Sequence, residues 1–121
     1  MLYRFKILGC GSSGGVPRVG FGWGKCDPKN KKNRRLRCSL LVERISNSEK
    51  TTVLIDTGPD IREQLLTANV IDLDAVIYTH AHADHVHGID DLRTLAYRKK
   101  SKIPLWADKA TQQRLLQGFS Y

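Results

Sequence analysis

The chain has 121 residues, 40% of them hydrophobic, so it can bury one modest core and forms a single domain at most. Its formal net charge of +8 favours phosphate-bearing or other anionic partners. No apolar run approaches the roughly 18–20 residues of a transmembrane helix, and the first strand-like stretch contains an arginine and a lysine, unlike a signal peptide. We therefore expect a cytoplasmic protein that does not engage a membrane.

The cysteines, Cys10, Cys26 and Cys38, are widely spaced and form no CxxC pair. An odd number at such spacing does not predict a disulfide framework, and it fits reduced thiols in a cytosol. A zinc site closed by cysteines of this chain alone is not expected either.

The first predicted element is a strand over residues 2–8, which leads into a glycine-rich segment at residues 9–15. The segment is neither a P-loop nor a dinucleotide fingerprint, because no GKS or GKT and no helix follow it. Two alternatives stay open. Either the turn holds phosphate, with Ser12 and Ser13 as contacts, or it lets the chain pass close to another backbone.

Residues 19–37 have little periodicity and are rich in Gly, Lys, Asn and Arg, which predicts a long loop. Its second half carries a run of basic side chains opposed by Asp27 alone. Such a run attracts phosphate, with Arg34 and Arg35 as candidate contacts, although a solvated loop is the commoner explanation of a charge run. Aromatic residues are not interleaved with the basic ones, so a stacking platform for single strands is not indicated.

A hairpin and a helix are predicted next. Residues 38–44 and 51–56 have the pattern of two antiparallel strands around a polar turn. A helix should then run up to Asn69, with Asp60 as its N-cap and Glu63 completing a capping box.

The rest of the chain alternates short strands with helices. We expect a buried strand, a helix that Gly88 could interrupt, a further strand, and a last helix capped by Asp108. These elements cover residues 74–78, 84 or 85 to 98, 103–107, and the residues after 108. The order of elements predicts a mixed α/β layer structure, which some schemes would class as α+β.

All 4 histidines of the chain fall within residues 79–92, at His80, His82, His85 and His87. Asp84 lies among them, and an apolar stretch precedes them. Imidazole and carboxylate are ligands of borderline and hard divalent ions. This concentration therefore predicts a metal site rather than a polar surface loop.

The spacing H-x-H-x-D-H divides the ligands into two pairs. His80 and His82 alternate along extended chain after a strand, so they point to the same side and can grip one ion. Asp84 and His85 follow where the chain turns into a helix, and they can reach a neighbouring ion. Two such ions can clamp a reacting phosphate and activate water, which makes Asp84 a candidate catalytic residue as well.

Residues 79–85, THAHADH, resemble the metal motif of the metallo-β-lactamase superfamily, and residues 51–60, TTVLIDTGPD, resemble its first motif. The resemblance implies that residues 1–121 are the N-terminal half of that four-layer αβ/βα fold. It implies that His80 and His82 bind one metal, and Asp84 and His85 a second, either manganese or zinc. It also implies that Asp56 organises the metal loop through hydrogen bonds.

Further segments narrow the resemblance. GCGSSGGVP, KNRRLRCS and HVHGIDDLR are similar to the branch that contains phosphoribosyl 1,2-cyclic phosphate phosphodiesterases. Ribonuclease Z is a more distant relative. His87 lies outside the shared metal motif, so it and Asp90 are expected to support the site or the helix start rather than bind metal.

Two departures from the family pattern have consequences. The later family ligands are absent, because no histidine follows His87. We therefore expect the second half of the domain to be missing, metal binding to be weak, and this chain alone to have little or no catalytic activity. The branch can also carry a structural zinc on closely spaced cysteines, but Phe21 and Trp23 accompany Cys26 here, so we expect that zinc to be absent.

The implied function is a metal-dependent phosphodiesterase with a small phosphodiester substrate and two divalent ions. The alternatives are a hydrolase of another ester or thioester on the same fold, and a basic nucleic-acid-binding or ribonuclease Z-like protein. A half-domain would leave one sheet face uncovered, which favours a homodimer or other self-association.

Overall fold

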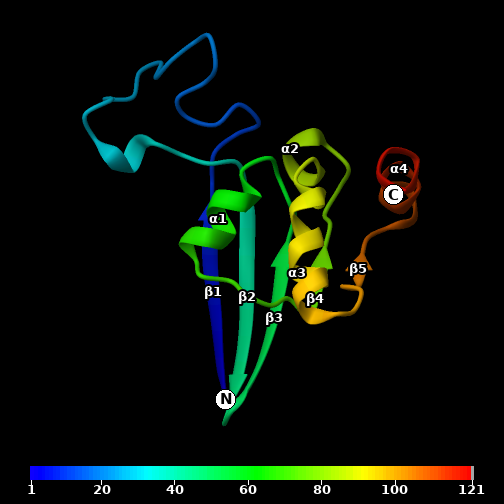
Figure 1. Cartoon of the computed structure of the whole chain (residues 1–121). Helices are drawn as coiled ribbons and strands as arrows, with labels where there is room; N and C mark the ends of the chain where they lie inside the picture. The colour runs from blue at the N-terminus through cyan, green and yellow to red at the C-terminus, as the bar shows by residue number, and fades with distance from the viewer. Residues whose placement is uncertain (121) are drawn as a thin grey trace.

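A five-stranded sheet, with strands in the order β1-β2-β3-β4-β5, organises the computed structural model, which describes residues 1–120 (Figure 1). The strands are β1 (Leu2–Gly9), β2 (Ser39–Ser46), β3 (Glu49–Ile55), β4 (Ala75–Ile77) and β5 (Leu105–Trp106). Tyr121, the last residue of the expected domain, lies outside the described residues.

Helices follow the strands in the second half of the chain. They are α1 (Ile61–Thr67), α2 (Ala83–Val86), α3 (Leu92–Lys99) and α4 (Lys109–Phe119), with short 3-10 helices η1 (Lys31–Asn33) and η2 (Ile89–Asp91). The mixed α/β fold class predicted from the sequence is confirmed. Within residues 1–120, none of the helices is long and apolar enough to cross a bilayer.

The sheet is antiparallel on one side and parallel on the other. The predicted hairpin joins β2 to β3, with Val42 opposite Val53. β4 and β5 add in parallel, so that Ile55 lies beside Ile77. Because parallel strands end at the same edge of a sheet, the segments after β3 and β4 emerge side by side, and the histidine motif follows β4 directly.

One face of the sheet holds the core, and α1 and α3 lie over it (Figure 1). Leu41, Leu54 and Val76, one from each central strand, are at most 2% exposed. Ile61 and Leu65 of α1 belong to the same buried cluster. Burial of apolar surface stabilises by about 25 cal/mol per Å², so this face supplies most of the hydrophobic stabilisation.

The opposite face carries apolar side chains that remain open to solvent among the described residues. Register partners share a face, so residues from all five strands form one continuous surface. We call this surface the open face, and it comprises Tyr3, Phe5, Ile7, Leu40, Val42, Val53, Ile55, Ile77 and Trp106. Phe5 and Ile7 are 66% and 71% exposed.

The helix predicted from residue 84 or 85 to 98 is divided into α2, η2 and α3, and the division falls at Gly88 as predicted. A Cβ on Gly88 would lie only 1.9 Å from the backbone oxygen of Gly58. The helix therefore breaks where the loop after β3 presses against it, and only glycine leaves room for that loop.

The predicted capping box at the start of α1 is wrong. Asp60 occupies the N-cap position, but its side chain makes no capping hydrogen bond. Its carboxylate instead accepts the backbone N–H of Arg37 at 2.8 Å and the Nη2 of Arg37 at 3.0 Å, while Glu63 pairs with the adjacent Arg62. A forked, charge-assisted pair is stronger than a neutral N–H cap, so Arg37 takes the carboxylate.

The glycine-rich segment is a close approach of two backbones, which was the second alternative for it. The N–H of Gly11 donates to the oxygen of Leu36 at 2.7 Å. A Cβ on Gly9 would lie 2.2 Å from the oxygen of Arg37. Ser12 and Ser13 are exposed at the tip of the turn.

Candidate metal centre

Asp56, directly after β3, is the hydrogen-bonding centre of the site. Its side chain is 4% exposed, and Oδ1 accepts the backbone N–H of Thr79 at 2.8 Å. Oδ2 accepts the Thr79 hydroxyl and the Nδ1 of His85, both at 2.7 Å. The backbone of Asp56 is left-handed (φ 66°), a strained conformation that Asn and Asp tolerate best. One buried carboxylate thus ties the ends of β3 and β4 to α2.

The hydrogen bond to Asp56 determines the tautomer of neutral His85. A carboxylate only accepts, so Nδ1 carries the proton and Nε2 keeps its lone pair. That Nε2 lies 3.3 Å from Oδ2 of Asp84. Two acceptor atoms this close need a proton or a cation between them, so the pair is suited to positive charge.

His80 is oriented in the same way. The Thr79 hydroxyl has one proton and donates it to Asp56, so its oxygen accepts from Nδ1 of His80 at 2.8 Å. The Nε2 of His80 therefore carries the lone pair. Histidines that bind metal commonly donate their second ring N–H to such a neighbouring group.

The rings of three motif histidines lie together. The ring centroid of His80 is 4.5 Å from that of His82 and 4.1 Å from that of His85. His82 is exposed at the N-terminus of α2, where its carbonyl accepts the N–H groups of His85 and Val86. Across residues 1–120, no group of three or more His, Cys, Asp or Glu side chains is arranged to hold one ion.

These donor atoms are of the types that bind divalent metal ions, but there are too few of them at either expected ion to form a closed site. His80 and His85 each present an Nε2 lone pair, and Asp84 adds a carboxylate, which together suit zinc or manganese. Each expected pair offers two protein ligands, whereas a catalytic zinc usually has three. Metal binding by His80, His82, Asp84 and His85 therefore stays a prediction.

Backbone contacts that sequence reasoning missed hold the two loops of the site together. The N–H of Thr57 donates to the oxygen of His85 at 2.8 Å, and the N–H of Gly88 donates to the oxygen of Thr57 at 2.9 Å. A Cβ on Gly58 would lie 2.3 Å from the oxygen of Asp84. The sequence signal that could have revealed these contacts is the Asp-Thr-Gly tripeptide at residues 56–58, which directly follows a strand.

Tyr78 is a second residue that sequence reasoning missed, and it holds the loop of the site that follows β3. Its hydroxyl forms a buried 2.7 Å hydrogen bond with the hydroxyl of Thr57. Burial raises the pKa of Tyr78 to about 12; the hydrogen bond to Thr57 opposes that change and the charge of Asp56 adds to it. Tyr78 therefore stays protonated at neutral pH and fixes the loop that carries Thr57.

The basic loop folds against the glycine-rich segment beside the motif. Together they line a cavity of about 300 Å³ whose wall includes Arg18, Arg34 and Arg35. Arg37 lies in the same wall, but its Nε is paired with Asp60 at 2.7 Å. The predicted phosphate contacts thus separate: Arg34 and Arg35 line the cavity, whereas Ser12 and Ser13 do not.

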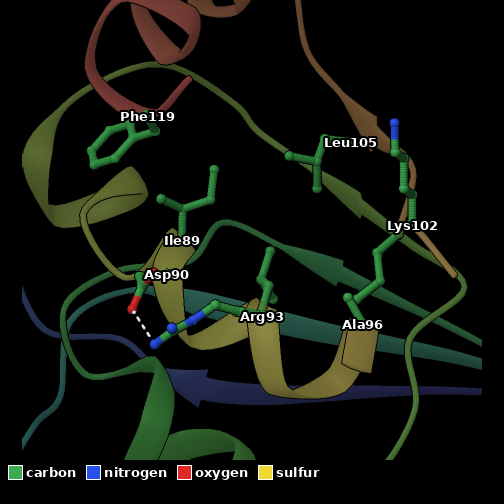
Figure 2. A pocket seen from close by; sticks show the side chains of 9 residues that line it. Ile89, Asp90, Arg93, Ala96, Lys102, Leu105 and Phe119 are labelled. Atoms are coloured by element: carbon green, nitrogen blue, oxygen red, sulfur yellow. Dashed lines mark hydrogen bonds and ion pairs between the residues drawn. The ribbon is translucent and has the colours of Figure 1, made fainter. Parts of the chain in front are cut away.

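His87 and Asp90 lie apart from the ring cluster. The ring of His87 contacts that of Phe119, with centroids 5.9 Å apart. Asp90 pairs with Arg93 at 3.3 Å. Figure 2 shows this pair at a second cavity, of about 330 Å³, between α3, β5 and the end of α4. Arg93, Phe119 and Leu105 of β5 line that cavity.

Comparison with known proteins identifies the family. A family model described as the beta-lactamase superfamily domain matches residues 51–121, a range that contains Asp56 and the whole H-x-H-x-D-H motif. The chain belongs to the β-lactamase superfamily. This membership confirms the family that the motif predicts, and the α/β architecture agrees with the metallo-β-lactamase fold.

Individual known proteins match most of this chain. The crystal structure of a diphosphatase from the PhnP family superposes with a TM-score of 0.82 at 37% identity, over 99% of this chain and 48% of its own. Zn²⁺-bound PqqB from Methylobacterium extorquens shares the fold, with a TM-score of 0.72 at 22% identity over 97% of this chain and 40% of its own. An octanoyltransferase from Porphyromonas gingivalis is 45% identical over 97 residues, which are 80% of this chain and 19% of that protein.

The chain therefore spans about half the length of the diphosphatase and about a fifth of the octanoyltransferase. Those two proteins are longer chains, and more than half of each has no counterpart in this chain.

Proposed function

We propose that this chain carries the metal-binding part of a hydrolase that cleaves phosphodiesters. The observation that supports this most strongly is the arrangement of protons on two histidines. Thr79 and Asp56 hold the Nδ1 protons of His80 and His85, which leaves both Nε2 atoms free to bind metal.

In this proposal His80 and His82 would hold one divalent ion, manganese or zinc, and Asp84 and His85 would hold a second. Such ions supply Lewis-acid chemistry, which polarises a phosphodiester and makes water more acidic. The protein residues orient and exchange protons. Asp56 keeps the proton of His85 on Nδ1, and the carboxylate oxygen of Asp84 that does not face His85 is the proposed acceptor for the proton of the attacking water.

The basic cavity supports a phosphodiester over a lactam or a thioester. Arg34 and Arg35 line it and are exposed, and the cavity lies next to the motif, since Gly58 sits between Arg37 and Asp84. A concentration of positive charge beside a metal site attracts anionic substrates and raises their local concentration. The substrate class therefore follows from charge, on a fold that hosts many chemistries.

Metal binding by the chain tests the proposed ligands. In calorimetric titration with Zn²⁺ or Mn²⁺ we expect weak binding, because each ion meets only two protein ligands. His82→Ala and Asp84→Ala should each weaken it at least about tenfold. His87→Ala is the matched control, because its ring contacts Phe119 instead of the cluster. Equal loss in His87→Ala, or tight two-ion binding by this chain, would contradict the assignment.

Hydrolysis tests the reaction. With Mn²⁺ or Zn²⁺ present, the whole protein should hydrolyse bis(p-nitrophenyl) phosphate, and His82→Ala or Asp84→Ala should lower kcat at least about 100-fold. His87→Ala should retain activity within about twofold, because surface changes away from the site are close to neutral. Unchanged activity in the first two variants would refute the proposal.

A nucleic-acid-binding function is the second candidate, because Lys29, Lys31 and Lys32 are exposed on the basic loop. It predicts RNA or DNA affinity that falls steeply with salt and survives chelation of metals. Fluorescence anisotropy with a labelled single-stranded RNA, in the presence of EDTA, would measure this. Binding that persists in EDTA while all hydrolysis is absent would favour this candidate over the phosphodiesterase.

A further inference from the structure

Cys10 and Cys38 lie on neighbouring segments just beyond the regular part of the β1–β2 ladder. The residues on either side of them are bridged, Gly9 with Ser39 in the antiparallel ladder and Gly11 with Arg37 in an isolated parallel bridge. Paired residues on neighbouring strands have Cα atoms about 4.5–5.5 Å apart, and Cys10 and Cys38 each lie between two such pairs. A disulfide spans a Cα distance of about 4.4–6.8 Å, so the backbone already brings these two cysteines within bonding range.

The two thiols have different surroundings. Both are free and exposed, and Nη1 of Arg35 donates a 3.1 Å hydrogen bond to the sulfur of Cys10. The pKa of Cys38 is raised by partial burial first, and then by the negative charges of Asp56, Cys10 and Asp84. Cys10 is thus close enough to Cys38 for its charge to contribute to the raised pKa of Cys38.

We propose that Cys10 and Cys38 form an oxidation site, at which hydrogen peroxide converts the two thiols into one disulfide. The Cys10 thiolate attacks one peroxide oxygen, which gives a sulfenic acid and releases hydroxide. The Cys38 sulfur then attacks the Cys10 sulfur, and its proton leaves with the departing hydroxyl as water. The thiols lose two electrons, and one peroxide becomes two waters once the hydroxide takes up the first thiol proton.

The strand that carries Cys38 also contacts the metal motif. The hydroxyl of Ser39 donates to the backbone oxygen of Asp56 at 2.9 Å and to that of Ile55 at 3.2 Å. Asp56 in turn binds His85. A disulfide at Cys38 therefore constrains the strand next to the residue that orients His85, so oxidation of the pair and the state of the motif are linked.

Peptide mapping tests the site, and Cys26 serves as an internal control because it is exposed and far along the loop. The reduced chain is treated with equimolar hydrogen peroxide, alkylated with N-ethylmaleimide and digested. We expect a peptide in which Cys10 is linked to Cys38, an alkylated Cys26, and full reversal by dithiothreitol. The linkage should persist in Cys26→Ser. Oxidation of Cys26 at the same rate, or links between chains only, would overturn the proposal.

Two further variants separate the roles of the thiols. In Cys38→Ser, Cys10 should accumulate as a sulfenic acid that dimedone traps, because its partner is gone. In Arg35→Ala, alkylation of Cys10 should slow about threefold while that of Cys26 stays constant, because the hydrogen bond that Arg35 donates to the sulfur of Cys10 is lost. Equal alkylation rates of Cys10 in both proteins, or no trapped Cys10, would count against the assigned chemistry.

Discussion

The two faces of the sheet are built from the same strands and differ in what covers them. Leu54 on one face is 0% exposed beneath the helices, and its neighbour Val53 on the other face is partly open. Both positions have the branched apolar side chains that favour strands. Local sequence therefore made both faces apolar, and only the position of α1 and α3 turned one of them into a core.

This difference predicts that the covered face contributes most to folding stability and that the open face is available for contact with another molecule. The covered face contains the residues whose loss would leave cavities. The open face exposes a continuous apolar surface, which in soluble proteins usually marks a site of contact. Substitutions on the two faces should therefore have different consequences.

The largest effect is expected for Leu54→Ala. Leu54 is fully buried on the covered face, and truncation leaves a cavity, so the free energy of unfolding should fall by about 2–5 kcal/mol. Val53→Ala, one residue away on the open face, should cost about 1 kcal/mol or less. Urea denaturation followed by far-UV circular dichroism measures both. Equal costs would show that the open face is buried as deeply as the covered one in solution.

Tyr78 on the covered face should give the next largest effect, seen at alkaline pH. Its folded-state pKa is raised from 10.0 to about 12, so the folded protein holds the phenolic proton more tightly than the unfolded chain. The resulting stability is fully present below pH 10 and is lost as pH rises toward 12. Two pKa units correspond to about 2.7 kcal/mol. The stability of wild type minus that of Tyr78→Phe, followed by urea denaturation against pH, should therefore fall by that amount and change sign, so that Tyr78→Phe becomes the more stable protein near pH 12.

Tyr3→Phe is the matched control for that measurement, because Tyr3 lies on the open face and is 55% exposed. It keeps Tyr78, so it should lose stability between pH 10 and 12 as the wild type does. At neutral pH, Tyr78→Phe should cost about 1 kcal/mol for the lost hydrogen bond to Thr57. A flat difference between wild type and Tyr78→Phe from pH 9 to 12 would contradict the assignment.

Self-association should show the smallest change in free energy. We propose that a second copy of the chain covers the open face, because its exposed aromatic and aliphatic side chains form one continuous apolar surface of the kind that soluble proteins bury in interfaces. Phe5→Lys combined with Ile7→Lys should weaken the dimer at least about tenfold, or about 1.4 kcal/mol, because charges would be buried. Analytical ultracentrifugation measures the dissociation constant.

Leu116→Lys is the control for association, because Leu116 is 68% exposed on α4, a helix whose neighbouring Leu115 packs into the covered core, and it is not one of the residues of the open face. It should leave the dissociation constant unchanged. A wild-type chain that is monomeric at every concentration, or a dimer that Leu116→Lys dissociates equally, would show that the open face does not pair with itself.

Much of the fold could be predicted because its signals are local. The hairpin follows from alternation in residues 38–44 and 51–56, and the structure extends it to β2 and β3 with the same pairing. The break at Gly88 was visible as a glycine within a helical stripe. The donors of the candidate site were visible because His80 to His85 are contiguous in sequence.

The errors arose where distant segments compete for one side chain. Asp60 has the sequence context of a helix cap, but Arg37, 23 positions earlier, takes its carboxylate. The approach of Gly58 to the segment that ends at Gly88 is likewise a contact between two loops. Local sequence patterns carry no information about such partners, because the partners meet only after the sheet has formed.

The amino-acid pattern was sufficient for the strands, for the donor atoms after β4 and for the family, since each depends on neighbours along the chain. Tertiary structure decided which sheet face is covered, because α1 and α3 pack on one side of it. It also decided which nitrogen of His80 and of His85 is free. The Nδ1 proton of His80 is held by Thr79, and that of His85 is held by Asp56. Asp56 contacts both Thr79 and His85 only because β3 and β4 end side by side.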